Sequence, residues 1–185
     1  GTTYHVTVSG ADSSQERRAV QSAIDRVLVE IERHLSTYDD TSEIAQLNRD
    51  ESRSWQDVSP TLFVVLQEAR DVSELTAGSF DVTVAPLLRL WGYEHGSAGP
   101  SAPTTFQAPT SGQLEQARAS VGYAKLELRR APRMSVRKSA SGMRLTVDGI
   151  APGYAVDRIA DALRHLGHTD WVEITQQQVN TFADA

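Results

Sequence analysis

The stretch that decides the fold is "LTVDGIAPGYAVDRIADALRHLG", residues 145–167. An apolar, β-branched run stops at Asp148, a loop with Gly149, Pro152 and Gly153 follows, and a helix then begins. Gly and Pro are the usual residues between secondary-structure elements, so ordinary loop chemistry explains this junction. In the other interpretation, the glycines bring the backbone close to a ligand, and the free N–H groups of the helix start favour an anion such as phosphate. The local pattern leaves both interpretations open.

Composition narrows the function classes only coarsely. The 185 residues, 39% of them hydrophobic and 23% charged, suit one globular domain with a single core. The formal net charge of -6 argues against a broad nucleic-acid-binding surface. Cys is absent, which removes disulfides, thiolate metal sites and a Cys nucleophile. No apolar run approaches the roughly 18 residues needed to cross a bilayer.

Hydrophobic periodicity and capping residues predict the order of the elements. Alternation predicts a strand over residues 2–8, and helical spacing predicts a helix from a Ser13–Glu16 capping box to about Leu35. The pattern at Ser42 is typical of another helix start. Further predicted elements are a helix between Ser59 and Gly78, a short helix at 113–120, strands at 125–128, 134–136 and 143–147, and the helix closed by Gly167.

These elements predict an α+β fold, with mixed helices and a mostly antiparallel sheet. The turns of that sheet are expected at residues 129–133 and 138–142, and the second turn is expected to separate a hairpin pair. Residues 95–112 are rich in Gly, Pro, Ser and Thr. We interpret them as a surface excursion rather than a domain boundary, so a single domain is expected over residues 1–185.

Several residues stand out as candidates for binding. Asp81 lies where an apolar run begins, and a buried carboxylate needs hydrogen-bond partners or a ligand. The alternative is that Asp81 caps a turn. Trp91 and Tyr93 are suited either to a flat wall for an aromatic ring or to the core. Tyr38, on the polar turn before Ser42, either reaches a ligand or closes the core.

Several common catalytic and metal-binding patterns are missing. The five His residues share no metal-ligand spacing, and His165 and His168 are typical of a solvated helix end. The sequence has neither the G-x-S-x-G context of a nucleophilic Ser nor the G-x-x-x-x-G-K-[ST] motif of P-loop proteins.

Five stretches taken in order carry a specific resemblance. They are "GTTYHVTV", "LSTYDDTSEIAQLN", "TAGSFDVTVAPLLRLWGYE", "VGYAKLEL" and "LTVDGIAPGYAVDRIADAL". Together they resemble the FAD:protein FMN transferases of the ApbE family, also called flavin-trafficking proteins. The resemblance implies an Mg²⁺-dependent enzyme that cleaves the pyrophosphate of FAD and releases AMP. The FMN would be joined through a phosphoester to a Thr or Ser hydroxyl of a partner protein, usually a subunit of a membrane redox complex.

The resemblance also implies site residues. Positions that border or contact the cofactor are matched by Tyr38, Ser79, Phe80, Asp81, Thr146 and Pro152. The backbone carbonyl of Gly149 matches a metal ligand. The family location implied is periplasmic or exported, with any lipid anchor carried by a segment before Gly1. No catalytic residue is assigned.

The chain also departs from the family pattern. The family loop commonly has the sequence L-D-L-G-G-I-A-K-G, whereas Thr146, Asp148 and Pro152 here replace Asp, Gly and Lys. The lost Lys removes a cation that could pair with phosphate. After Trp171 the family's further segments are missing, although "VNTFADA" resembles a late metal motif in which Asp184 would be a ligand. Two alternatives therefore stay open: a protein that binds FAD without turnover, and an FAD pyrophosphatase that uses water as acceptor.

Overall fold

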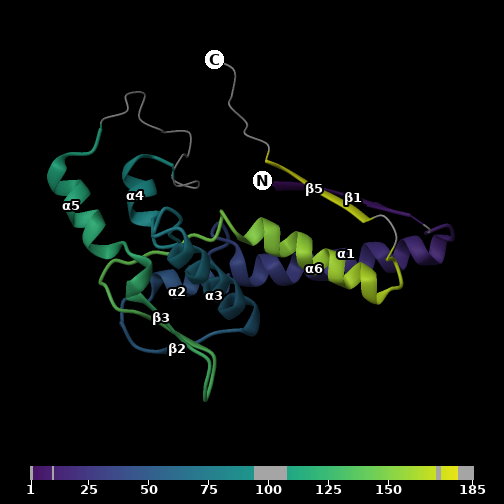
Figure 1. Cartoon of the computed structure of the whole chain (residues 1–185), viewed down its shortest axis with the longest axis horizontal. Helices are drawn as coiled ribbons and strands as arrows, with labels where there is room; N and C mark the ends of the chain where they lie inside the picture. The colour runs from purple at the N-terminus through teal and green to yellow at the C-terminus, as the bar shows by residue number, and fades with distance from the viewer. Residues whose placement is uncertain (1, 10, 94–107, 170–171, 179–185) are drawn as a thin grey trace. The chain divides into compact units, whose positions relative to one another are not determined.

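The computed structural model describes residues 2–9, 11–93, 108–169 and 172–178, and the chain forms two compact units (Figure 1). The first unit comprises residues 1–31 and 151–185, and the second comprises residues 32–150. Helix α1 (Ser14–Leu35) begins in the first unit and ends in the second. The expectation of a single domain over the whole chain stays a prediction.

The first unit combines a two-stranded ribbon with two helices. Strand β1 (Thr2–Val8) pairs antiparallel with β5 (Val172–Gln178), and Val8 lies opposite Val172. Helix α6 (Ala151–His165) packs against α1, because both helices carry an apolar stripe at helical spacing. Their shared core consists of Val20, Ile24, Ile159 and Leu163, with Val6, Val8, Val27 and Leu28 packed partly buried against it.

Capping explains where α1 begins and where α6 ends. The backbone N–H of Glu16 donates to Ser13 Oγ at 3.1 Å, and that of Ser13 donates to Glu16 Oε2 at 2.9 Å, so the predicted capping box is confirmed. Gly167 ends α6 with a φ of 89°. The N–H of His168 then donates to Leu163 O at 3.1 Å, which satisfies a terminal carbonyl as the sequence predicts.

The second unit packs short helices beside a small antiparallel sheet (Figure 1). Its helices are α2 (Glu43–Arg49), α3 (Pro60–Leu75), α4 (Ala85–Leu90) and α5 (Ser111–Ser120), and a 3₁₀ turn, η1, spans Tyr123–Lys125. The sheet has the order β2 (Gln56–Asp57), β4 (Ser135–Lys138), β3 (Leu126–Arg129). Ser59 caps α3, and the helix residues Leu62, Val65, Leu66 and Ala69 are 0–1% exposed. The α+β prediction is confirmed.

The predicted strand at residues 143–147 is wrong, and so is the hairpin across residues 138–142. Segment 143–147 is not part of a sheet because other groups take its backbone hydrogen bonds. Asn48 Nδ2 donates to Leu145 O at 2.8 Å, Leu145 N donates to Asn48 Oδ1 at 2.7 Å, and Thr146 N donates to Val82 O at 2.8 Å. The hairpin that forms instead joins β3 and β4, and β2, α4 and β5 were not predicted.

The C-terminal end of α2 is held by a buried lysine from β4. The Lys138 ammonium donates to the carbonyls of Leu47 at 2.6 Å, Asn48 at 3.2 Å and Asp50 at 2.6 Å. Its burial lowers the pKa of Lys138, and the nearby Arg144 charge lowers it further. Because a helix leaves its last carbonyls unpaired, these three bonds fix the position of the α2 end.

Within the described residues, no helix combines the length and the apolar character that a membrane crossing requires.

Candidate functional site

The second unit contains a cleft of about 580 Å³, which is within the usual size of a small-molecule site. Four segments line it: the turn after α1, helix α2, the α4 region, and the extended segment 144–148. Of the sequence-predicted cofactor residues, Tyr38 and Thr146 both line this cleft. The structure therefore brings together two candidates that lie 108 positions apart in sequence.

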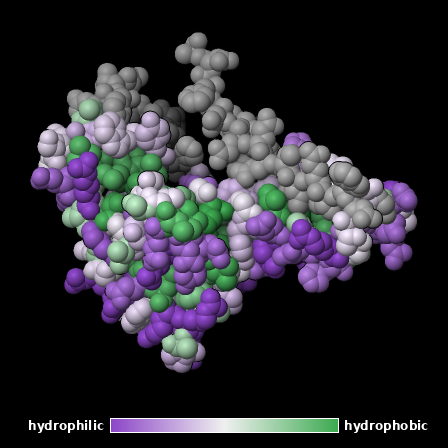
Figure 2. All heavy atoms as spheres, viewed as in Figure 1, coloured by the Kyte–Doolittle hydropathy of each residue, from purple (hydrophilic) through white to green (hydrophobic). Residues whose placement is uncertain are grey.

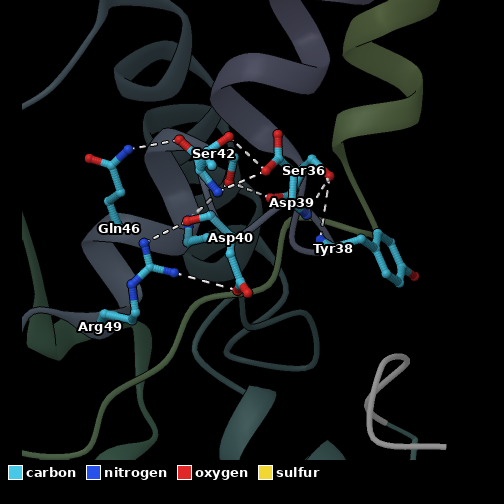
Figure 3. Close-up of polar contacts among 9 residues, drawn as sticks. Ser36, Tyr38, Asp39, Asp40, Ser42, Gln46 and Arg49 are labelled. Carbon is cyan, nitrogen blue, oxygen red and sulfur yellow. Dashed lines mark hydrogen bonds and ion pairs between the residues drawn. The ribbon is translucent and has the colours of Figure 1, made fainter. Parts of the chain in front are cut away.

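The turn after α1 is braced by its own side chains (Figure 3). Ser36 Oγ accepts from the backbone N–H groups of Tyr38 at 3.3 Å and Asp39 at 3.2 Å. Asp39 Oδ1 accepts from both the N–H and the hydroxyl of Thr41 at 2.7 Å. Ser42 Oγ donates to Ser36 O and caps α2, as predicted for a helix start. In Figure 3 the Tyr38 ring points away from this network, and the residue is 61% exposed.

Tyr38 remains a hydrogen-bond donor at neutral pH. Partial burial raises the pKa of its phenol above the usual 10.0, and the Asp148 carboxylate raises it further, since both disfavour the phenolate. Asp148 Oδ1 in turn accepts from Thr37 Oγ1 at 3.1 Å. This bond ties the turn after α1 to the end of segment 144–148, so the two walls of the cleft are joined here.

Segment 143–148 forms one wall of the cleft through its alternating side chains. Met143, Leu145 and Val147 are almost completely buried, at 0–1% exposure. The intervening Arg144, Thr146 and Asp148 line the cleft. Successive side chains of an extended chain point to opposite sides, so the alternation puts one cation, one hydroxyl and one carboxylate on the ligand side.

The cleft is rich in cations for a chain with a net charge of -6. Arg49, Arg89 and Arg144 line it, together with Asp40 and Asp148. Arg49 Nη2 donates to the carbonyl oxygen of Asp40 at 2.5 Å, and Nη1 lies 3.4 Å from the Asp40 carboxylate. The lining also includes Tyr93, which is 68% exposed. Guanidinium groups and aromatic rings together suit a ligand with both anionic and planar parts.

Asp81 caps a turn, which is the second of the two interpretations that the sequence left open for this residue. Its Oδ1 accepts from the N–H of Thr83 at 2.8 Å and from its hydroxyl at 2.6 Å. Its Oδ2 accepts from the N–H of Tyr123 at 2.9 Å. Asp81 and its neighbours Ser79 and Phe80 are not among the residues lining the cleft. Their contact with FAD stays a prediction.

Gly149 is explained by packing. A Cβ atom at this position would lie 3.1 Å from Phe80 Cε2, which is tighter than normal van der Waals contact. Glycine therefore lets the Phe80 ring approach the backbone at the end of segment 144–148. A Cβ at Gly153 would meet no atom within 4 Å, so packing does not require that glycine. Pro152 lies in the first turn of α6, where proline is well tolerated.

The two residues that the resemblance implies as metal ligands are Gly149 and Asp184. Among the described residues, no group of three or more His, Cys, Asp or Glu residues is arranged to hold a metal ion. The carbonyl of Gly149 is the one predicted ligand in the described part of the chain, and Asp184 lies outside it. The metal and cofactor roles of Gly149, Asp184 and Pro152 stay predictions.

Comparison with known proteins decides the family. A profile described as the ApbE family matches residues 1–173. The chain belongs to the ApbE family. The FAD:protein FMN transferase of Vibrio cholerae is 32% identical over 167 residues, which cover 90% of this chain and 47% of the relative. That of Haemophilus influenzae is 29% identical over 175 residues, which cover 93% of this chain and 49% of the relative.

Solved ApbE structures share the fold. The flavin transferase ApbE from Vibrio cholerae superposes with a TM-score of 0.78 at 31% identity, covering 96% of this chain and 54% of that one. The apo form of the Pseudomonas stutzeri flavinyl transferase ApbE gives a TM-score of 0.75 at 26% identity. This ApbE chain spans about half the length of the relatives it matches.

Sequence reasoning missed four residues that shape the ApbE cleft: Asn48, Arg49, Arg89 and Arg144. Arg144 had a usable signal, because it lies two positions before Thr146 on the same face of an alternating segment. Asn48 had none, since its role depends on a contact with Leu145, 97 positions away.

Proposed function

We propose that the protein containing this chain transfers FMN from FAD to a Thr or Ser hydroxyl of a partner protein and releases AMP. The observation that carries this proposal is the family match over residues 1–173, supported by relatives that bear the name FAD:protein FMN transferase. Since the chain spans about half of those relatives, the activity is proposed for the whole protein.

The proposed reaction is a phosphoryl transfer. The acceptor oxygen attacks the phosphorus on the FMN side of the pyrophosphate, and the bond from that phosphorus to the bridging oxygen breaks. AMP leaves with the bonding electron pair, and the hydroxyl proton passes to solvent. Such a reaction depends mainly on positioning and on stabilising the charge of the phosphate oxygens.

The cleft supports FAD as the ligand. Tyr38 and Tyr93 offer aromatic faces against which a flavin ring can pack, and the Tyr38 phenol remains protonated to donate a hydrogen bond. The three arginines supply positive charge for phosphate oxygens. An ApbE-type ligand with a planar ring and a pyrophosphate therefore matches the chemistry of the lining.

The remaining parts of the proposal rest on the family resemblance. They are a requirement for Mg²⁺, an acceptor in a membrane redox complex, and a periplasmic or exported location. Mg²⁺ would neutralise charge on the phosphate oxygens. The Gly149 carbonyl and Asp184 are the ligands that we propose from this chain.

A second candidate is an FAD-binding protein without turnover, and Pro152 favours it because the family commonly has a Lys at this position. The pyrophosphatase alternative differs only in its acceptor, which is water.

Incubation of the purified protein with FAD, with and without Mg²⁺, tests the proposal by chromatography of AMP. The transferase proposal expects AMP only with Mg²⁺, and covalent flavin fluorescence on an acceptor protein in a denaturing gel. Mg²⁺-dependent AMP without covalent flavin on the acceptor indicates a pyrophosphatase. FAD that is bound but not cleaved indicates a binding protein, and no binding at all refutes the flavin assignment.

A further inference from the structure

Strand β3 is an edge strand of the small sheet in the second unit. In the order β2–β4–β3, strand β4 lies in the middle, and within the described residues no strand pairs with the outer side of β3. Figure 2 shows mainly hydrophilic residues around the end of the unit where Figure 1 places this sheet. We propose that β3 pairs antiparallel with β3 of a second copy of this chain, with Leu128 on the two-fold axis.

The backbone of β3 directs the hydrogen-bonding groups of Leu128 outward. The N–H of Ser139 donates to Lys125 O at 2.9 Å, which fixes the alternation of the β3–β4 ladder. Since hydrogen-bonded residues alternate along an antiparallel ladder, the N–H and C=O of Glu127 and Arg129 face β4, and those of Leu128 face away from it. Two copies of Leu128 on a two-fold axis would each donate to the carbonyl of the other, so the pairing satisfies both groups.

The side chains of β3 select this register. Glu127 and Arg129 lie two residues apart on the same face of the strand. With Leu128 on the axis, Glu127 of each copy lies opposite Arg129 of the partner subunit, and symmetry gives two such pairs. Moving the axis by one residue would place two glutamates or two arginines opposite each other, which like-charge repulsion disfavours. The edge is therefore complementary to itself in one register.

Both charged side chains remain accessible for such pairs. Glu127 accepts from Arg137 of its own chain, but its side chain is still 34% exposed. The guanidinium of Arg129 lies over the Trp55 ring, 4.4 Å from its centroid, and Arg129 is an exposed residue. The stacking limits the freedom of the guanidinium before association, so less conformational entropy is lost when it pairs.

Concentration dependence is the first test. A pairing of two short strands covers less than a standard interface, so we expect a Kd of about 0.1 mM, measured by sedimentation equilibrium. Native-state hydrogen exchange by NMR reports the edge itself. The Leu128 amide should exchange more slowly as the protein concentration rises, whereas the Glu127 amide, already bonded to β4, should not change.

Charge variants test the register. Arg129→Glu makes this face of β3 acidic and Glu127→Arg makes it basic, so neither variant should pair with itself. The Kd of each should rise at least about tenfold, because symmetry repeats the repulsion. An equal mixture of the two variants restores opposite charges at both pairs and should associate again. Arg118→Glu, at an exposed position of α5, makes the same change of net charge as Arg129→Glu and should leave association unchanged.

The outcomes decide the proposal without any flavin, so they are independent of the proposed function. Wild-type protein that stays monomeric at about 1 mM overturns it. Association that Arg129→Glu leaves unchanged, or that does not protect the Leu128 amide, overturns it too, because another surface would then be responsible. Thermal unfolding establishes that each variant is folded. If Glu127→Arg does not fold, Arg129→Glu and the Leu128 amide still decide.

Discussion

Two extended segments, on either side of the turn at 139–142, are held in place in different ways. Residues 135–138 form β4, whose backbone pairs with β2 on one side and β3 on the other. Residues 143–147 bury every second side chain but have no strand partner in the described part of the chain, and the side-chain amide of Asn48 holds Leu145. An extended backbone must satisfy its hydrogen bonds, but a ladder is only one way to do so. The segment without a ladder is the one that lines the cleft.

The largest expected effect comes from shortening a buried side chain in segment 143–147, which has no strand pairing in the described part of the chain. Leu145→Ala should lower the free energy of unfolding by about 3 kcal/mol, because a fully buried Leu leaves a cavity. Val136→Ala in β4 should cost about 2 kcal/mol, since it removes a smaller buried side chain. Urea denaturation followed by circular dichroism measures both.

Leu75, which is 87% exposed, provides the matched control. Leu75→Ala should change the free energy of unfolding by less than about 0.5 kcal/mol. If Leu145→Ala is no more destabilising than this control, segment 143–147 is not anchored in the core.

The second prediction removes the hydrogen bonds between Asn48 and Leu145 and leaves the strand pairing of β4 intact. Asn48→Leu should lower the free energy of unfolding by about 2 kcal/mol, because the buried N–H and C=O of Leu145 lose their partner. Asn48→Asp keeps the acceptor for Leu145 N but sets a carboxylate oxygen against the Leu145 carbonyl oxygen, so it should not restore the lost stability. Native-state hydrogen exchange should show a faster amide at Leu145 with unchanged protection across β4, and equal loosening of β4 would contradict the distinction.

The third prediction concerns the end of segment 143–148. Gly149→Ala should lower the free energy of unfolding by about 1 kcal/mol, because the new Cβ crowds the Phe80 ring. Phe80→Leu should relieve most of this crowding, so the double variant should lose less than the sum of the two single changes. Thermal denaturation of all four proteins completes the cycle, and strict additivity would show that the ring does not require this glycine.

The smallest expected effect concerns Asp57 in β2, the strand that pairs with β4. Hydrogen bonds from Arg133 and then Ser135 hold the pKa of Asp57, in β2, below its usual 3.8. A lowered carboxylate pKa gives stability that is complete above pH 3.8 and is lost as the pH falls through the folded value. The free energy of unfolding of wild type relative to Asp57→Asn should therefore shrink below pH 3.8. A difference that is constant from pH 7 to 2 would contradict this assignment.

Much of the fold was predictable because its signals are local. The Ser13–Glu16 box, the Ser59 cap and Gly167 each act within a few residues of the helix that they start or end. Helix α4 was not predicted because it has only six residues and no side-chain cap at its start. Strand β2 has two residues, too few for alternation to be visible.

The candidate site was predictable only in part. The resemblance indicated Tyr38 and Thr146, and both line the cleft. Neither the resemblance nor the local pattern indicated Arg89 or Arg144. Surface arginines are common, so an arginine in a short polar or alternating segment does not by itself indicate a binding site. Asp81 was open between two interpretations, and only the positions of Thr83 and Tyr123 showed that its carboxylate is used to cap a turn.

By itself the sequence determined the starts of α1 and α3, the end of α6 and the ApbE resemblance, because capping and periodicity act between near neighbours. Tertiary structure alone decided which backbone groups pair over long separations. Lys138 reaches the end of α2 across about 90 positions, and Asn48 reaches Leu145 across 97. Such contacts depend on the packed geometry of distant segments, and no local pattern encodes their distance. The cleft with its three arginines is the result of those contacts.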